Sequence, residues 1–385
     1  MERKKALLVV AGGRALPDVI ALFCVQPELL VFLTSEEGWH AEEVFESIAQ
    51  SVPTCKNIFP IRNVSAYNFE AGKRACEQVC ESYPEAEWEW IFAIGSGPKI
   101  TCIAAYEVAR QKGIPCLYID TVHEKVVSLV KEYAGQEKDL FHLDIPRYMK
   151  IQRRTYRENK GTTAAYRSTV EQWGHMAREL ALSPDTVHFT FTLRKKDRKE
   201  SDPVTLPSEL ATSPLLQTLE KTYNLIEIKP DSAGTLICTF TSSEAAHFLS
   251  TGDWLEIYVW HEAKLAHFVD DCQWGYRVLD GNAENELDLA VTYKAQLIIG
   301  ECKTDYNPFK DKRKYLESLD STANLLGGLY VTRVFITNQP KTREGYDSFK
   351  EQAEKRRIVV VTAEDLLYVG DILKREAVKP TYARI

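Results

Sequence analysis

The chain has 385 residues, which at about 150 residues per domain predicts two or three domains. Hydrophobic residues make up 44% of it and charged residues 27%, a composition typical of folded globular proteins that excludes a disordered or fibrous chain. The formal net charge of −7 argues against a protein that coats nucleic acid permanently, but leaves room for local basic grooves.

Membrane and secretory segments are not expected. No apolar run approaches the roughly 18 residues of a membrane span. The apolar stretch at 6–10 is short and is followed by Gly12 and Gly13, so we interpret it as a buried strand and not as a signal peptide. Nine scattered cysteines without a CxxC pair favour reduced, buried thiols in a cytoplasmic protein.

Short apolar runs alternate with amphipathic stretches of helical length over residues 1–145. We expect strands at 6–10, 29–33, 56–61, 91–94 and 116–119. We expect helices at 16–25, 39–51, 66–82 and 99–112, and a further strand or hairpin between 120 and 130. Nearly all-apolar strands are typical of parallel sheets buried on both faces. The alternation therefore predicts a doubly wound α/β domain.

A basic segment, 146–165, is predicted to link this domain to the rest of the chain. Beyond it we expect a helix at 163–181, a strand at 187–193, a charged loop at 194–200, and a loop and helix punctuated by Pro203, Pro207 and Pro214. The remaining pattern predicts a mixed α/β module with a helix at 254–264 and strands near 268–274, 287–292, 295–303, 331–337 and 358–361.

The strongest chemical signal is a strand carrying Asp288, followed by a buried strand that ends with Glu301, Cys302 and Lys303. Because side chains alternate along a strand, Glu301 and Lys303 share a face, and a hairpin can bring Asp288 within reach of Glu301. Two carboxylates and the backbone carbonyl of Cys302 would offer oxygen ligands to Mg²⁺ or Mn²⁺. Such a metal polarises a phosphodiester and activates a water, while Lys303 would orient that water or neutralise the transition state.

Two alternatives stay open for these residues. Glu301 and Lys303 would form an ordinary salt bridge if their strand were exposed, but the apolar run 297–300 favours a central strand, where unpaired charge is costly. Glu256 is a further candidate ligand. Equally, Asp253 as N-cap and Glu256 three residues later would make a capping box.

The arrangement of Asp288, Glu301 and Lys303 resembles the PD-(D/E)xK restriction-endonuclease-like fold, with Leu287 in place of the proline. Segments 252–258 and 326–328 resemble the branch in which this nuclease follows a CARF domain, the Rossmann-like sensor of cyclic oligoadenylates in type III CRISPR defence. The resemblance covers nearly the whole chain, and implies a CARF domain at 1–145 and a nuclease domain at 166–385.

The resemblance also implies a homodimer that is activated by cyclic tetra-adenylate and depends on Mn²⁺ or Mg²⁺. It implies cleavage of DNA, by nicking or single-strand cutting, and/or of single-stranded RNA. The catalytic residues that match are Glu256, Asp288, Glu301 and Lys303. The metal would be held by Glu256, Asp288, Glu301 and Cys302.

Two loops of the first domain follow strands at the carboxyl edge of the sheet, where ligands bind in open α/β folds. Glycines let the backbone approach a phosphate, a helix N-terminus offers amide donors, and Lys99 offers charge. Loop 95–101 resembles the ligand loop of the family; the alternative is that its glycines only make a tight turn. The expected ligand-binding residues are Gly12, Gly13, Arg14, Ala15, Leu16, Ser35, Gly95, Ser96, Gly97 and Lys99.

We therefore predict a ligand-activated, metal-dependent nuclease. Basic residues at 147–160, 194–199 and 310–314 would line a groove for the nucleic acid strand. One alternative is a cyclic-nucleotide sensor with an inactive nuclease fold that regulates by binding nucleic acid. Another is a sensor domain in which Ser96 and Lys99 help to cut the ring itself.

Overall fold

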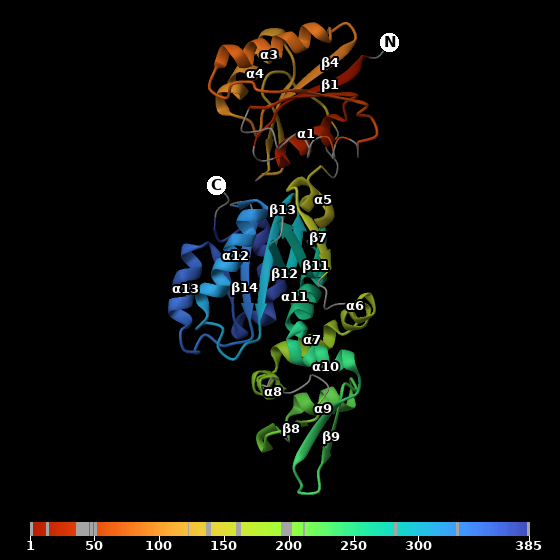
Figure 1. The fold of residues 1–385 in the computed structure, drawn as a ribbon, viewed down its shortest axis with the longest axis vertical. Helices are drawn as coiled ribbons and strands as arrows, with labels where there is room; N and C mark the ends of the chain where they lie inside the picture. The colour runs from red at the N-terminus through yellow and green to blue at the C-terminus, as the bar shows by residue number, and fades with distance from the viewer. Residues whose placement is uncertain are drawn as a thin grey trace. The chain divides into compact units, whose positions relative to one another are not determined.

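The computed structural model forms two compact units, Met1–Thr155 and Tyr156–Ile385, which Figure 1 shows as ribbons. The structure describes residues 3–12, 15–35, 46, 49, 52–121, 123–135, 140–158, 163–193, 202–210, 212–280, 283–328 and 331–382. Gly13, Arg14, the charged loop 194–200 and nearly all of the helix predicted at 39–51 lie outside the described residues.

The first unit is built on a six-stranded sheet with the order β3-β2-β1-β4-β5-β6. Its strands are β1 (Lys4–Val10), β2 (Leu29–Leu33), β3 (Asn57–Ile61), β4 (Trp88–Ala93), β5 (Cys116–Asp120) and β6 (Lys125–Ser128). All neighbours run parallel except β5 and β6, which form the expected antiparallel hairpin. This is the predicted doubly wound sheet, with its switch point between β1 and β4.

Helices cover both faces of this sheet (Figure 1). The helices of this unit are α1 (Leu16–Val25), α3 (Phe69–Ser82), α4 (Lys99–Lys112) and α5 (Ile145–Ile151), of which α1, α3 and α4 cover the sheet. Residues of α3 and α4 join the alternate β1 residues Ala6, Leu8 and Val10 in one apolar cluster, while α1 packs on the opposite face. The apolar part of β1, residues 6–10, is thereby buried on both sides, as is typical of parallel strands.

The loops that follow β1 and β4 contact each other at the switch point. The backbone N–H of Gly12 donates to Ser96 Oγ at 3.0 Å, and the Ser96 hydroxyl donates to the buried carboxyl of Asp18 in α1. A Cβ atom on Gly12 would overlap the carbonyl oxygen of Ser96, and one on Gly97 would overlap Val10. Close approach of the two loops therefore requires glycine at both positions.

The second unit has a six-stranded mixed sheet with the order β15-β14-β13-β12-β11-β7. Its strands are β7 (Thr155–Glu158), β11 (Asp271–Asp280), β12 (Ala283–Tyr293), β13 (Gln296–Lys303), β14 (Val331–Thr337) and β15 (Ile358–Val361). Strands β11, β12 and β13 form an antiparallel meander, whereas β13, β14 and β15 run parallel. The mixed α/β class predicted for this part is confirmed.

Two pairs of helices cover the two faces of this sheet. Helices α11 (Asp253–Leu265) and α14 (Val369–Val378) share a core with Ile298, Cys302 and Ile336. Helices α12 (Lys312–Leu326) and α13 (Tyr346–Lys355) lie on the other face, where Phe335 contacts Tyr315 and Phe349. Odd-numbered residues of β13 therefore face α12.

A smaller layer precedes α11 in the chain. It contains helices α6 (Ala164–Glu171), α7 (Gly174–Leu182), α8 (Thr186–Leu193), α9 (Pro214–Lys221) and α10 (Ser243–Thr251), with a 3₁₀ turn at Ser208–Leu210. A three-stranded sheet with the order β8-β10-β9 completes it, from β8 (Val204–Thr205), β9 (Ile226–Pro230) and β10 (Leu236–Phe240). A second 3₁₀ helix, Ala363–Tyr368, leads into α14.

The strand predicted at 187–193 is wrong, because this segment is helix α8. Its β-branched and aromatic residues have high strand propensity, but Phe189 and Leu193 are buried on one side of the helix. The threonines bond within the helix: Thr190 Oγ1 donates to the carbonyl oxygen of Thr186 at 2.8 Å. Packing has overridden local propensity here.

The single helix predicted at 163–181 is also wrong. The chain forms two helices, α6 and α7, separated at Gln172 and Trp173. Helix α7 begins at Gly174, where a Cβ atom would overlap the ring of His261 in α11. The predicted linker 146–165 contains α5 and β7, and the division into units after Thr155 falls inside it.

The buried Asp18 carries a prediction about stability. Burial raises the pKa of Asp18 well above its ordinary value of 3.8, against a smaller opposing effect of the Ser96 hydrogen bond. Between pH 3.8 and the raised pKa, only the folded protein keeps the proton, so the free energy of unfolding falls as pH rises. We expect Asp18→Asn to raise this free energy at pH 8 by about 1 kcal/mol or more, and by less at pH 4.

Urea unfolding of the wild type and the variant at pH 4, 6 and 8 measures the difference. Glu81→Gln, at an exposed position in α3, is the control for the loss of one carboxylate from the same unit. A gain in stability that stays constant from pH 4 to pH 8 would contradict the argument from burial.

Candidate functional site

Strands β12 and β13 separate at the point where the predicted catalytic residues lie. Their ladder runs from the Tyr293–Gln296 pair to the Leu289–Gly300 pair and ends there. Beyond it, the side chain of Asp288 replaces the backbone ladder, because its Oδ2 accepts from the backbone N–H of Cys302 at 2.7 Å. The splayed strands thus place a buried carboxylate beside the end of β13.

The three strongest candidates from the sequence come together at this place. Lys303 Nζ lies 3.0 Å from Asp288 Oδ2 and 2.8 Å from Glu301 Oε1. Lys303 also lies over the ring of Tyr315 in α12, 5.7 Å from its centroid. Glu301 and Lys303 therefore share the face of the sheet that α12 covers, as their alternation in the strand predicts.

Cys302 faces the opposite way. Its thiol is buried in the apolar core between the sheet and α11, so only its backbone is available to the carboxylate cluster. Burial is the main cause that raises the pKa of this thiol well above its ordinary value, which leaves it uncharged. A role of Cys302 in holding a metal stays a prediction about its carbonyl oxygen.

Glu256 lies in the first turn of α11, and the capping box that competed for it is not formed. The N-cap of α11 is Gly252, with a φ of 98° and no side-chain cap. Asp253 is already inside the helix, and its carboxylate accepts from Tyr166 Oη at 2.9 Å and from Thr251 Oγ1 at 2.6 Å. The side chain of Glu256 is therefore not engaged in capping.

Gly275 brings Glu256 close to the middle of the meander. It lies between two residues of β11 that pair on either side of Asp288, and it has a φ of 61°. A Cβ atom on Gly275 would lie 3.9 Å from Glu256 Oε2 and 3.4 Å from Arg167 Nη1. These are ordinary contact distances, so it is the positive φ of Gly275, and not a lack of space, that disfavours a side chain here.

The acidic groups of this cluster repel one another. Burial first, and then the charge of Asp288, raise the pKa of Glu301 to about 7 against the opposing effect of Lys303. The same two causes raise the pKa of Glu256 well above its ordinary value. Burial alone would lower the pKa of Lys303, but contacts with Asp288 and Glu301 raise it, so its ammonium stays charged.

The donor set suits a divalent cation by its chemistry. In the part of the chain that the structure describes, no three His, Cys, Asp or Glu side chains are arranged to hold a metal ion. Instead, Asp288 and Glu301 direct one oxygen each toward the Lys303 ammonium. Two carboxylates converging on one positive charge are the hard oxygen ligands that Mg²⁺ and Mn²⁺ prefer.

Sequence reasoning missed Arg167, which supports the site from α6. This buried side chain donates from Nη2 to the carbonyl oxygen of Trp274 at 2.9 Å and stacks 4.3 Å from the Trp274 ring centroid. It thereby fixes the backbone beside Gly275. Its ion pair with Glu171 in the same helix is an ordinary pattern, whereas the bond to Trp274 joins residues more than 100 positions apart, which no local pattern reveals.

The predicted ligand-binding residues differ in what they offer. Leu16 and Ser35 are buried, and the Ser96 hydroxyl is engaged with Asp18 and Gly12. Lys99 is exposed in the first turn of α4, whose N-cap, Pro98, provides no side-chain cap for the helix amides. Among the described residues of these loops, Lys99 and the backbone at 15 and 95–97 are thus the groups that reach the surface, whereas Gly12 is buried and its N–H is engaged by Ser96.

The basic residues expected to line a groove are partly neutralised. Arg157 pairs with Glu284. Lys310 lies 3.0 Å from Glu344 Oε2, and Arg313 lies 3.1 Å from Glu317 Oε1. The groove therefore stays a prediction.

Among the described residues, no helix is both long and apolar enough to cross a membrane.

Comparison with known proteins gives matches at the level of domain and fold. Residues 243–378 match the family model of the Card1-like endonuclease domain, and this range contains Glu256, Asp288, Glu301 and Lys303. No curated protein sequence matches the chain significantly.

The solved structures extend the likeness over the whole chain. Can2 from Sulfobacillus thermosulfidooxidans, in complex with cyclic tetra-adenylate, is 20% identical with a TM-score of 0.71, covering 96% of this chain and 98% of that one. Protein VC1899 from Vibrio cholerae is 19% identical with a TM-score of 0.71, covering 96% and 97%. A type III CRISPR defence DNA nuclease activated by cyclic oligoadenylate is 14% identical with a TM-score of 0.53, covering 88% and 46%.

The resemblance found in the sequence is thereby confirmed: the chain joins a doubly wound α/β domain to a domain that matches the Card1-like endonuclease model, in a fold that it shares with Can2.

Proposed function

We propose that this protein is a nuclease of type III CRISPR defence that is activated by a cyclic oligoadenylate and depends on a divalent metal. Its substrates are DNA, by nicking or single-strand cutting, and/or single-stranded RNA. The observation that carries the proposal is the cluster of Asp288, Glu301 and Lys303 at the end of β13, inside a Card1-like endonuclease domain. A buried cluster of two carboxylates and an ammonium is costly unless chemistry requires it.

The metal is Mn²⁺ or Mg²⁺ in this proposal, held by Asp288, Glu301, Glu256 and the Cys302 carbonyl. When bound, it supplies Lewis acidity toward the phosphodiester and lowers the pKa of water. Burial, and after it the charge of Asp288, raise the pKa of Glu301 to about 7, so part of the shift comes from repulsion between the two carboxylates. A divalent cation relieves that repulsion, which supports the assignment.

Lys303 has two roles here. It holds the two carboxylates in register in the absence of other cations, since it contacts both. Its raised pKa keeps it protonated at every physiological pH. A charged ammonium at the reacting phosphate neutralises the charge that develops in the transition state, or orients the attacking water.

The activator in this proposal is cyclic tetra-adenylate, the ligand present in the Can2 structure. It would bind at the switch point of the first sheet, over the loops at 12–16 and 95–99 and beside Ser35. Lys99 and the uncapped start of α4 supply charge and amide donors for phosphates. To activate, the ring must bind the active arrangement more tightly than the idle one.

A homodimer in the cytoplasm is part of the proposal. Helix α4 exposes Ile100 and Ile103, and the adjacent hairpin exposes Tyr118 and Val127. Exposed apolar side chains on contacting elements, here α4 and the hairpin strand β5, suit an interface between two copies. The nine cysteines form no disulfide, which fits a reducing compartment.

The catalytic cluster carries the first functional prediction. With Mn²⁺ and cyclic tetra-adenylate, the wild type should cut a plasmid or a single-stranded RNA. Glu301→Gln and Lys303→Ala should each lower the cleavage rate at least about 100-fold, because each removes a charge at the reacting centre. Binding of the activator, measured by calorimetry, should not change.

Glu317→Gln, on the exposed side of α12, is the matched control and should cleave like the wild type. Retained cleavage in Glu301→Gln would sink the catalytic assignment. A wild type that binds DNA only with the activator, and never cuts, would favour the alternative of a sensor with an inactive nuclease fold.

The second prediction concerns the activator. Lys99→Ala should weaken binding of cyclic tetra-adenylate about tenfold, because a charged hydrogen bond to a phosphate is lost. Lys112→Ala changes the same charge at the far end of the same helix and should bind normally. Equal losses in both variants would show that only net charge matters, and no loss in Lys99→Ala would remove this residue from the site.

The third prediction concerns the metal, read without any catalysis. Mn²⁺ should raise the midpoint of thermal unfolding of the wild type, because it binds the folded state, and EDTA should reverse the shift. Asp288→Asn should abolish the shift, whereas Asp347→Asn, at an exposed position in α13, should keep it. A full shift in Asp288→Asn would place the metal elsewhere.

A further inference from the structure

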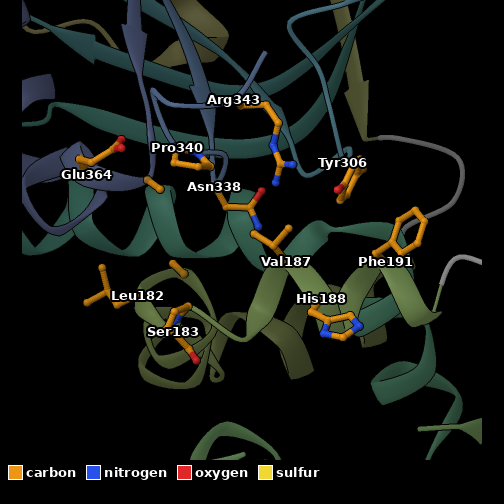
Figure 2. Close-up of a pocket in the computed structure, with 13 residues that line it drawn as sticks. Leu182, Ser183, Val187, His188, Phe191, Tyr306, Asn338, Pro340, Arg343 and Glu364 are labelled. Atoms are coloured by element: carbon orange, nitrogen blue, oxygen red, sulfur yellow. The ribbon is translucent and has the colours of Figure 1, made fainter. Parts of the chain in front are cut away.

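A cavity of about 690 Å³ opens at the carboxyl ends of β13 and β14, within the second unit (Figure 2). One wall comes from the loops that follow these strands, with Tyr306, Asn338 and Arg343. The opposite wall is helix α8, with His188 and Phe191. None of these residues belongs to the carboxylate cluster described above, and the cavity has the size of a small-molecule or nucleotide site.

Two exposed aromatic rings stand side by side on this cavity. Phe191 is 55% exposed and Tyr306 is 53% exposed, with ring centroids 5.0 Å apart. Figure 2 shows them next to each other at one end of the cavity. Aromatic rings of this size are mostly buried in a folded domain, and an exposed pair offers flat apolar surface for stacking another ring.

A guanidinium group extends this surface. Arg343 lies over the Tyr306 ring, 4.4 Å from its centroid. It is held there by Gln339, whose Oε1 accepts from Arg343 Nε at 3.2 Å and from Nη2 at 3.0 Å. The planar cation is thus fixed in position before any ligand arrives, and it suits both a stacked base and a phosphate.

A buried polar group without a partner points to a ligand in this cavity. Asn338 is 4% exposed, and its Oδ1 accepts from Gln339 Nε2 at 3.4 Å. Its Nδ2 is buried and has no hydrogen-bond partner among the residues that the structure describes. In Figure 2 the amide reaches from the end of β14 toward α8, across the cavity. A buried unsatisfied donor is costly unless a ligand accepts from it.

The cavity lies a few residues along the chain from the catalytic cluster. Tyr306 follows Lys303 by three residues, so their Cα atoms are at most about 11 Å apart. Between them, Asp305 Oδ2 accepts from Tyr315 Oη at 2.6 Å, and the same Tyr315 ring lies under Lys303. The distance between the two places is therefore short enough for one strand bound at the catalytic cluster to reach Tyr306 within a few nucleotides.

We propose that this cavity binds one unpaired nucleobase of the strand being cut, an inference that rests on the proposed nuclease function. The base stacks on Phe191 and Tyr306, and Asn338 Nδ2 donates to a carbonyl oxygen or ring nitrogen on its edge. Arg343 contacts the base face or the adjoining phosphate. A base inside a duplex cannot reach such a pocket, so the site selects single-stranded or unpaired substrate.

The test uses single strands that carry one 2-aminopurine at successive positions, bound to the activated protein in EDTA so that nothing is cut. Stacking on a ring quenches the fluorescence of this base. We expect quenching at one position, near the site of cleavage that the same strand shows with Mn²⁺. Phe191→Ala and Tyr306→Ala should remove the quenching and weaken binding about tenfold, as loss of one stacked base does.

Tyr368→Ala removes an equally exposed aromatic ring, 58% exposed, from outside the cavity, and should quench like the wild type. Asn338→Leu should keep the stacking signal and lower the preference for the 2-aminopurine strand over one with an abasic site at the same position. Unchanged quenching in Phe191→Ala and Tyr306→Ala, or no quenched position in a wild type that cuts, overturns the inference and leaves the nuclease intact. A wild type that neither binds nor cuts single strands fails at the proposed function itself.

Discussion

The second unit depends on one positive charge, the Lys303 ammonium, placed between two carboxylates. Without it, Asp288 and Glu301 would face each other in a medium of low dielectric constant at the end of a buried strand, at a cost of several kcal/mol. The strand pairing accommodates the three groups, since the ladder between β12 and β13 stops one residue before Asp288. The Asp288 carboxylate then accepts a hydrogen bond from the backbone N–H of Cys302, which lies beyond the end of the ladder. Asp288 thus belongs to the charged cluster and also completes the hydrogen bonding at the end of β13.

Much of this arrangement follows from short-range patterns in the sequence. A continuous apolar run predicts β2 at its observed bounds, because strands buried on both faces permit few polar residues. The bounds predicted for β14 are also the observed ones, although this strand contains Arg333. Helix α4 is predicted to the residue as an amphipathic stretch. In the structure it ends with Arg110 and Lys112 in its last turn and Gly113 as its C-cap. The proximity of Asp288 to Glu301 follows from the hairpin that joins their strands.

The remaining features depend on contacts that no local pattern encodes. Helices α10 and α11 share Gly252 as a cap, so Asp253 lies within α11 and turns toward Tyr166 in a distant helix. Strand propensity gives way in α8, where the fold supplies a core for Phe189. Arg167 bonds backbone carbonyls that only the tertiary structure brings near. Local sequence preference therefore predicts an element correctly where tertiary packing agrees with it, and the prediction fails where packing favours another structure.

The contact between the two glycine loops has a consequence for signalling within the first unit. Gly97 lies against Val10, the last residue of β1, and Gly12 lies against the backbone of Ser96. Strand β1 is hydrogen-bonded on both sides, to β2 and β4, in the interior of the sheet. A displacement of either loop would therefore also displace the other loop and the end of the central strand β1. A ligand held by these loops, as in the proposed function, would therefore act on the central strand and not on one loop alone.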